Sequence, residues 1–208
     1  MEESNLNSMV YSRNVIEFVT VAGEYCNFLE KAGKTEKRNF LEKIQKLLPL
    51  LYLKVSLLPE VETEFEEETP EKFVSELDYN RILQITSGLL GEHDDYQEVF
   101  TPGMQYSESA LTANISEDLA DIYQDLKDFV SLYRIGNEPA IEAGLWECRN
   151  NFREFWGQKL VNCLRAVHQL VFGNIDFDEQ QTIRLKSEEE EETEGPVWLN
   201  RKFRNEED

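Results

Sequence analysis

The chain has 208 residues, of which 40% are hydrophobic and 11% aromatic, so it can bury a sizeable core and is not disordered throughout. Its 42 acidic and 21 basic residues give a net charge of −21. This charge opposes direct binding to nucleic acid and to anionic membranes unless the basic residues are concentrated in one place.

The cysteines and the apolar stretches predict where the protein resides. Three cysteines without a CxxC pair are typical of reduced thiols. The first residues, MEESNLNS, lack the basic start and apolar run of a signal peptide. The longest apolar stretch, LLPLLYLKVSLL, is too short to span a bilayer. We therefore expect a cytoplasmic protein without a membrane anchor.

Two helices are predicted in the first quarter of the chain. The first covers Tyr11 to Lys31, with Ser12 as its cap and an apolar face that repeats every three or four residues. The second begins at Thr35 and keeps helical spacing to Val55. Pro49 predicts a kink or a split in it, because proline removes a backbone donor. The part after Pro49 is apolar nearly all round, which predicts a central, well-covered helix.

The next segment is predicted to be a loop, a helix and a second loop. Residues 59–68 read as an exposed acidic loop. Thr69-Pro70-Glu71 has the cap, proline and acid that begin a helix, and this helix extends to about Leu90. A short helix at 91–100 is possible, and a loop follows to Asn114. No segment shows convincing strand alternation.

Ser116 to Tyr133 is the clearest helix, and it has two faces. Ser116 caps it, and apolar residues recur at steps of three and four along one face. Asp118, Asp121, Asp125 and Asp128, here called the aspartate stripe, lie side by side about 100° around the helix. The stripe is a candidate surface for a divalent cation or a basic partner. The alternative is a solvated face that pairs with Arg149 and Arg153 of the last helix.

The last long helix begins at Glu138-Pro139 and runs to about Phe172. Arg165 and His168 are three residues apart on it and form a candidate anion contact, or else one edge of a helical core. Gly157, after Trp156, permits close approach by another helix or a ligand. Glycine inside a helix costs about 1 kcal/mol against alanine, so some feature of the fold must favour it here. Tight packing is the simplest such feature.

The composition changes after the last helix, so we expect one all-helical domain at 1–174 and an acidic tail at 175–208. The tail holds twelve acidic and five basic residues, including Glu188 to Glu192. Residues 196–205 differ, because aromatic and basic residues alternate there. They form a candidate docking segment with Trp198, Leu199, Arg201, Lys202 and Phe203. The alternative is that this segment folds back on the domain's own acidic surface.

The sequence lacks the common signatures of cofactor and catalytic sites. Neither of the two histidines lies in a Glu-x-x-His motif, which disfavours a di-iron bundle, and a zinc site is disfavoured too. There is no GxSxG, Walker A or GxGxxG motif. We therefore expect no cofactor, and we expect a non-enzymatic protein rather than an enzyme.

EDLADIYQDLKDFVSLY, followed by WECRNNFREFWGQKLVNCLRAVH, resembles a bacterial family of domains of unknown function, number five thousand and sixty-three. VIEFVTVAGEYCNFLE, LLPLLYLKVSLLP and DDYQEVFTP are similar to the same family. The resemblance spans about Val10 to Phe172 and leaves the tail outside. It implies a small, all-helical, cytosolic bacterial domain and no assigned reaction.

Together these observations predict an all-α, single-domain bundle of five or six helices with an acidic C-terminal tail. The favoured function is a helical interaction protein, an adaptor or accessory subunit, whose partner has a basic surface. One alternative is an enzyme that handles a divalent metal or phosphate with the aspartate stripe, Arg165 and His168. Another is an acidic mimic of nucleic acid that occupies a basic protein.

Overall fold

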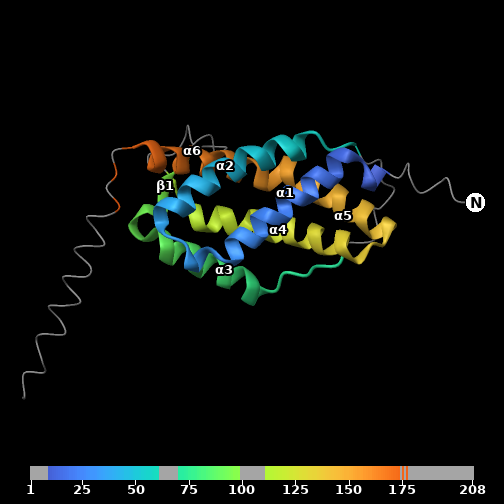
Figure 1. Ribbon diagram of the computed structural model, residues 1–208, viewed down its shortest axis with the longest axis horizontal. Helices are drawn as coiled ribbons and strands as arrows, with labels where there is room; N and C mark the ends of the chain where they lie inside the picture. Colours follow the sequence, from blue (N-terminus) through green and yellow to red (C-terminus); the bar gives the residue numbers. More distant parts are fainter. Residues whose placement is uncertain (1–8, 61–69, 99–110, 174, 176, 178–208) are drawn as a thin grey trace, which may run out of the picture. The chain divides into compact units, whose positions relative to one another are not determined.

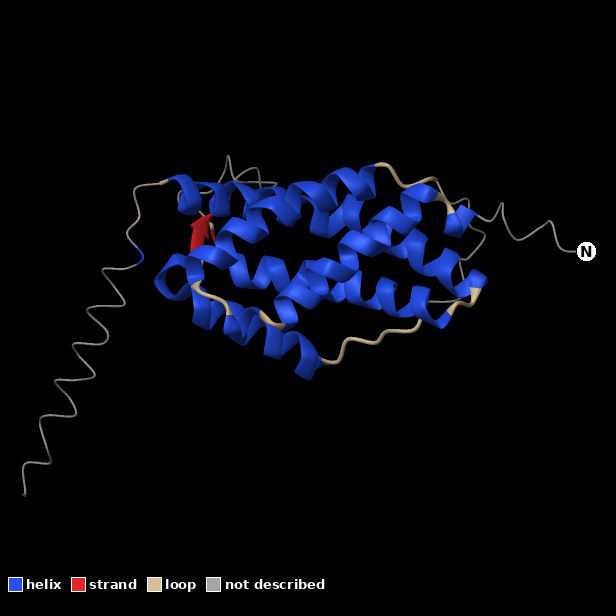
Figure 2. Cartoon of the chain, in the orientation of Figure 1, coloured by secondary structure: helices blue, strands red, loops and turns tan. Residues whose placement is uncertain are grey.

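The structure is a computed structural model that describes residues 9–60, 70–98, 111–173, 175 and 177. Within these ranges it has six α-helices: α1 (Arg13–Glu30), α2 (Lys37–Ser56), α3 (Glu76–Leu90), α4 (Ile115–Ile135), α5 (Glu138–Asn151) and α6 (Gly157–Phe172) (Figures 1 and 2). Short 3-10 turns occupy Met9–Tyr11, Ala32–Lys34 and Gly91–His93. The predicted all-α class is therefore confirmed. The chain divides into Met1–Gly173 and Asn174–Asp208, and the architecture below is that of the first unit.

Helix α4 is the central element, because α1, α3, α5 and α6 all pack against it (Figure 1). Its apolar face is buried, as its periodicity predicts. The rings of Phe18 on α1 and Phe129 on α4 stack with their centroids 5.6 Å apart. The buried Tyr25 hydroxyl donates to the Leu119 carbonyl over 2.9 Å. The core therefore lies around the apolar side of α4.

Helix α2 lies beside α6, and the two run in opposite directions (Figure 1). Tyr52, near the end of α2, contacts Phe152 just before α6, with ring centroids 5.2 Å apart, whereas Gln45 lies beside His168. The helix continues through Pro49, so the predicted split does not occur. Pro49 is exposed, and the helix therefore loses one backbone hydrogen bond without losing core packing.

Helix α3 begins at Glu76 rather than near Pro70, so the predicted start was wrong. The cap is a capping box in which Ser75 and Asp78 accept hydrogen bonds from each other's backbone N–H groups, each over 3.2 Å. This reciprocal pair outweighs the proline signal upstream. Leu77, in the first turn of α3, is 81% exposed.

A small antiparallel hairpin, missed in the sequence, precedes α4. Strand β1 (Asp95–Gln97) pairs with β2 (Thr112–Asn114), and three residues per strand are too few to show alternation. The hairpin places Asp94 at the start of α4, where its carboxylate accepts hydrogen bonds from the Ser116 N–H (2.8 Å) and hydroxyl (2.5 Å). Ser116 is therefore held by a cap from another segment and is not itself the cap.

The predicted last helix is continuous in space but includes a π-helical turn, Phe152–Trp156, between α5 and α6. A Cβ atom at Gly157 would lie 2.3 Å from the Phe152 carbonyl oxygen. The close contact is thus within the same helix, not with a ligand. The wider turn directs Trp156 into the core, where its Nε1–H donates to the Cys148 carbonyl over 3.2 Å.

Candidate functional site

The aspartate stripe lies against other parts of the chain rather than on an open surface. Asp118 and Asp128 are 3% and 4% exposed, and Asp121 and Asp125 are partly buried. Two of the four carboxylates of this candidate surface are therefore buried, and the other two are partly covered. The spacing placed the four carboxylates on one side of α4 correctly, but α6, the hairpin and the segment before α3 cover that side.

Asp118 and Asp121 share one cation, and each accepts a hydrogen bond from a different tyrosine. The Lys159 ammonium lies 2.7 Å from Asp121 Oδ2 and 3.5 Å from Asp118 Oδ1. The Tyr96 hydroxyl donates to Asp118 over 2.5 Å, and the Tyr79 hydroxyl donates to Asp121 over 2.9 Å. All four carboxylate oxygens thus have partners, which come from α3, β1 and α6. Burial raises the pKa of Asp118 to about 6, although Tyr96 and Lys159 oppose this rise.

Asp128 anchors the extended segment that precedes α3. Its Oδ1 accepts the Phe73 N–H over 2.7 Å and the Val74 N–H over 2.9 Å, and Lys72 lies 3.8 Å from its other oxygen. Lys72 also pairs with Glu147 of α5 at 2.5 Å. This carboxylate therefore ties three segments together.

Asp125 lies between these two clusters on α4 and has fewer polar contacts. Its Oδ1 accepts a hydrogen bond from the Asn151 side chain over 2.6 Å. Burial is the main cause that raises the pKa of Asp125 to about 6. Its role in the described structure is a link between α4 and the end of α5.

The stripe pairs with the predicted last helix, as the alternative interpretation expected, but through other residues than Arg149 and Arg153. Arg149 pairs with Glu60 over 3.1 Å, and Arg153 is exposed, whereas Lys159 and Asn151 contact the stripe. Helical periodicity could not distinguish these neighbours, because the π turn shifts the register after Phe152. Among the described residues, no group of three or more His, Cys, Asp or Glu side chains could hold a metal ion.

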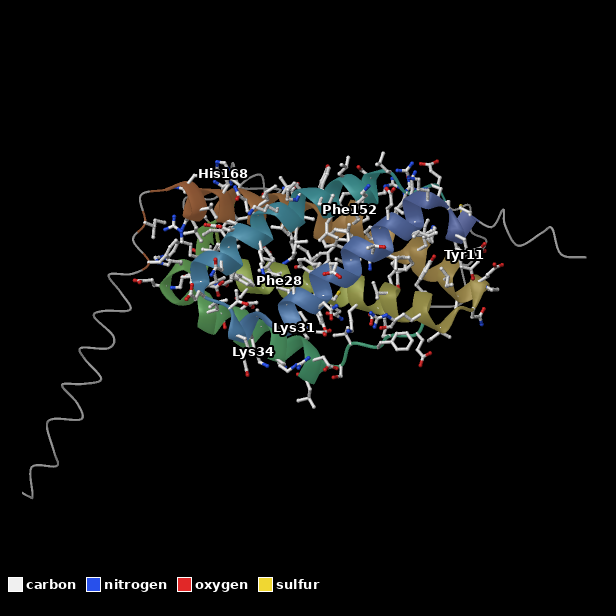
Figure 3. The ribbon with its side chains drawn as sticks, in the orientation of Figure 1. Tyr11, Phe28, Lys31, Lys34, Phe152 and His168 are labelled. Carbon is white, nitrogen blue, oxygen red and sulfur yellow. The ribbon has the colours of Figure 1, made fainter. Side chains whose placement is uncertain are left out.

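Arg165 and His168, the candidate anion contact, line a groove between α2 and α6. Figure 3 labels His168 on α6. The groove has a volume of about 480 Å³, and its other walls are Gln45, Pro49, Val161 and Leu164. Arg165 donates a hydrogen bond to the Gln97 carbonyl over 2.6 Å. The His168 and Phe172 rings have their centroids 4.7 Å apart. The two predicted residues therefore meet at the rim of an apolar groove, and anion binding there stays a prediction.

The same helices form a surface that sequence reasoning missed. We call it the α2/α6 face, and it comprises exposed residues of both helices and of the α2 C-cap: Lys43, Lys46, Leu50 and Leu53 of α2, Leu57 at its C-cap, and Val161, Arg165 and His168 of α6. The three leucines are 38%, 52% and 47% exposed, so the predicted well-covered helix was wrong. The available signal was local charge: α2 has five basic residues and one acidic residue in a strongly acidic chain.

The candidate docking segment at 196–205, with Trp198, Leu199, Arg201, Lys202 and Phe203, lies outside the described residues. The acidic run at 188–192 lies outside them as well. Among the helices that are described, none combines the length and apolar character needed to cross a membrane.

Residues 9–173 match the family described as Domain of unknown function (DUF5063). The chain belongs to this family. Its fold is similar to the crystal structure of protein BF1032 from Bacteroides fragilis, with a TM-score of 0.70 and 41% sequence identity over 80% of this chain and 98% of that chain. No curated protein matches the chain. The resemblance seen in the sequence is therefore confirmed, and the family's description assigns no activity.

Proposed function

We propose that this domain is a non-enzymatic interaction module that binds a partner protein through the α2/α6 face. The observation that carries the proposal is the row of exposed leucines at positions 50, 53 and 57, which lies beside an apolar groove. Single exposed apolar residues are ordinary on protein surfaces, whereas contiguous ones mark interaction sites. An adaptor or accessory subunit needs such a surface and no reactive group.

The arrangement of the aspartates also supports the proposal, because it disfavours the two alternative functions. An enzyme that used the stripe to bind Mg²⁺ would need carboxylate oxygens free to coordinate the ion. Asp118 and Asp121 already bind Lys159 and two tyrosines, and Asp128 binds two backbone N–H groups. Mimicry of nucleic acid would require exposed rows of carboxylates, and two of these four are buried.

Affinity capture with matched surface variants tests the proposed function. The full chain, a Leu53→Asp variant and a Leu77→Asp variant are each used to capture partners from a lysate of the source cell. Both leucines are exposed on helices, but Leu77 lies on α3, away from the face. We expect the wild type and Leu77→Asp to retain the same protein and Leu53→Asp to lose it. Equal capture by all three, or no specific capture by the wild type, would overturn the proposal.

Two further arms address the tail and the enzymatic alternative. Removal of residues 175–208 shows whether the candidate docking segment contributes to the captured complex. Calorimetric titration of the wild type and Asp121→Ala with Mg²⁺ and Mn²⁺ tests the stripe directly. We expect no heat of binding in either protein. Metal binding that disappears in Asp121→Ala would support the metal-handling alternative instead.

A further inference from the structure

The α2/α6 helix pair has a charge opposite to that of the whole chain. The two helices carry seven of the 21 basic residues but only one of the 42 acidic residues. Several of these cations are used internally: Lys54 pairs with Glu17, Arg38 with Glu42, and Lys159 with the stripe. Two others have uncharged partners: Lys43 lies over the Phe28 ring, and Arg165 donates to the Gln97 carbonyl.

Two cations, Lys46 and Arg165, contribute to the rim of the groove. Lys46 precedes Pro49 by three residues and so neighbours it on α2, and Arg165 lines the groove from α6. Among the described residues, neither side chain forms an ion pair with a carboxylate. His168 adds an imidazole to the same rim. The groove thus has an apolar floor and a basic rim.

A groove with this chemistry complements an amphipathic helix that carries acidic residues. Such a helix places apolar side chains at i, i+3, i+4 and i+7 into a groove, while charges on its flanks pair with the rim. Leu53 follows the groove residue Pro49 by four positions, and Leu57 follows Leu53 by four, so helical spacing continues an exposed apolar row from the groove along α2. A basic helix would bring like charges to Lys46 and Arg165, which is unfavourable.

We infer that the α2/α6 groove binds an acidic amphipathic helix of a partner protein. The inference rests on the proposed function and adds the chemistry of the partner to it. It differs from the expectation of a basic partner, which came from the net charge of the whole chain. Because charges are screened beyond about 8 Å at physiological ionic strength, the local basic rim determines what binds in the groove.

Larger anionic partners fit the groove less well than a single helix. A membrane or a nucleic acid duplex extends far beyond the groove and would approach the acidic remainder of the surface as well. A single helix about 10 Å across is narrow enough to contact the groove alone. Its apolar side chains also enter the concave floor, which a flat bilayer surface does not match.

Selection from a displayed library of random peptides, each about 15 residues or four helical turns long, tests the inference. The full chain is the bait, and binders that also bind Leu53→Asp are removed. We expect the selected peptides to share acidic residues and apolar residues at helical spacing. Lys46→Glu and Arg165→Glu should each weaken a representative peptide at least about tenfold. Lys34→Glu is the matched control, because Lys34 is exposed but lies before α2, away from the groove (Figure 3).

A basic consensus, the absence of any groove-dependent peptide, or full binding by both charge-reversal variants would overturn the inference. In each case, loss of the captured partner in Leu53→Asp would still support the proposed function, so the two failures are distinguishable. Phosphatidylserine-containing vesicles and a DNA duplex serve as further probes. If the wild type binds either probe and both Lys46→Glu and Arg165→Glu lose this binding, the groove binds that probe's class of ligand, and the acidic-helix inference is overturned.

Discussion

The aspartate stripe and the α2/α6 face contrast in almost every respect. The stripe is the most regular charge pattern in the sequence, and the structure uses it internally: Asp118 and Asp128 are buried and hydrogen-bonded. The α2/α6 face has no motif, yet it exposes three leucines beside a groove with a basic rim. A regular charge pattern on one helix therefore does not identify a binding surface, because other segments determine the environment of its side chains.

The contrast has a physical basis in how each region satisfies its polar groups. Buried carboxylates are tolerated only with hydrogen bonds and cations around them, and each one in the stripe has at least one such partner. Exposed leucines need no partner to be tolerated, but the free energy of the system falls when another apolar surface covers them. The stripe is thus already satisfied within the fold, and the face gains stability from a partner.

Among the substitutions in the stripe, the largest effect is expected from Asp128→Ala. The substitution removes the acceptor for the Phe73 and Val74 N–H groups and the nearest charge to Lys72. Hydrogen bonds to a charged group contribute more than neutral ones, so we expect a loss of about 3 kcal/mol in the free energy of unfolding, measured by urea denaturation. Glu24→Ala, at an exposed position of α1, should change it by no more than about 0.5 kcal/mol. An equal effect of the two substitutions would mean that the stripe is not structural.

Lys159→Met should have the next largest effect, about 2 kcal/mol. Lys159 is the cation between Asp118 and Asp121, and without it two partly or fully buried carboxylates repel each other. Its charge lowers the pKa of Asp118, so its removal should raise that pKa above about 6. The destabilisation should therefore be greatest near pH 8 and decrease toward pH 5, where the Asp118 carboxyl gains a proton.

Chemical denaturation of Lys159→Met across this pH range measures the effect. The matched control is Arg38→Met, which removes an exposed pair with Glu42 and should cost no more than about 0.5 kcal/mol. A cost for Lys159→Met that is independent of pH would contradict the assignment of Lys159 as the neutralising cation.

The all-α class could be predicted from the sequence because local periodicity determines it. The burial of Leu119, Leu126 and Phe129 follows from spacing on a single helix, and all three lie in the core. The starts of helices were harder to predict, because several residues can act as caps. Ser75 with Asp78 forms a capping box, and the Thr69-Pro70-Glu71 sequence does not begin α3.

The environment of the candidate site could not be predicted, because it depends on contacts between distant segments. Tyr96 reaches Asp118 from 22 positions earlier in the chain, and Phe73 reaches Asp128 from 55 positions earlier. Helical spacing carries no information about such neighbours. The basic character of α2 was visible in the sequence, but its exposed side depended on how α1 and α6 pack against it.

A smaller effect, and of opposite sign, is expected from Asp125→Asn. Burial raises the pKa of Asp125 in the folded protein to about 6, above its ordinary value of 3.8. The stabilising contribution of this carboxyl is therefore fully present below about pH 4 and is lost as the pH rises through about 6. Asparagine carries no charge and retains an oxygen that can accept the Asn151 hydrogen bond.

We therefore expect Asp125→Asn to be more stable than the wild type above pH 6, by on the order of 1 kcal/mol, and to match it near pH 4. Thermal or urea denaturation at a series of pH values measures this difference. A variant that is less stable than the wild type at pH 7.5 would show that the charged form makes a favourable contact, which would place Asp125 with Asp128 instead.

The smallest effect on stability is expected on the α2/α6 face. Leu53 is 52% exposed, so Leu53→Asp should change the free energy of unfolding by no more than about 0.5 kcal/mol. Leu51, two residues earlier on the same helix, is fully buried, and Leu51→Asp places a charge in the core and should cost at least about 4 kcal/mol. Urea denaturation of the two variants compares them directly. Because loss of binding counts as evidence only in a folded protein, a strongly destabilised Leu53→Asp would make the leucine row part of the core and would remove the contrast between the face and the stripe.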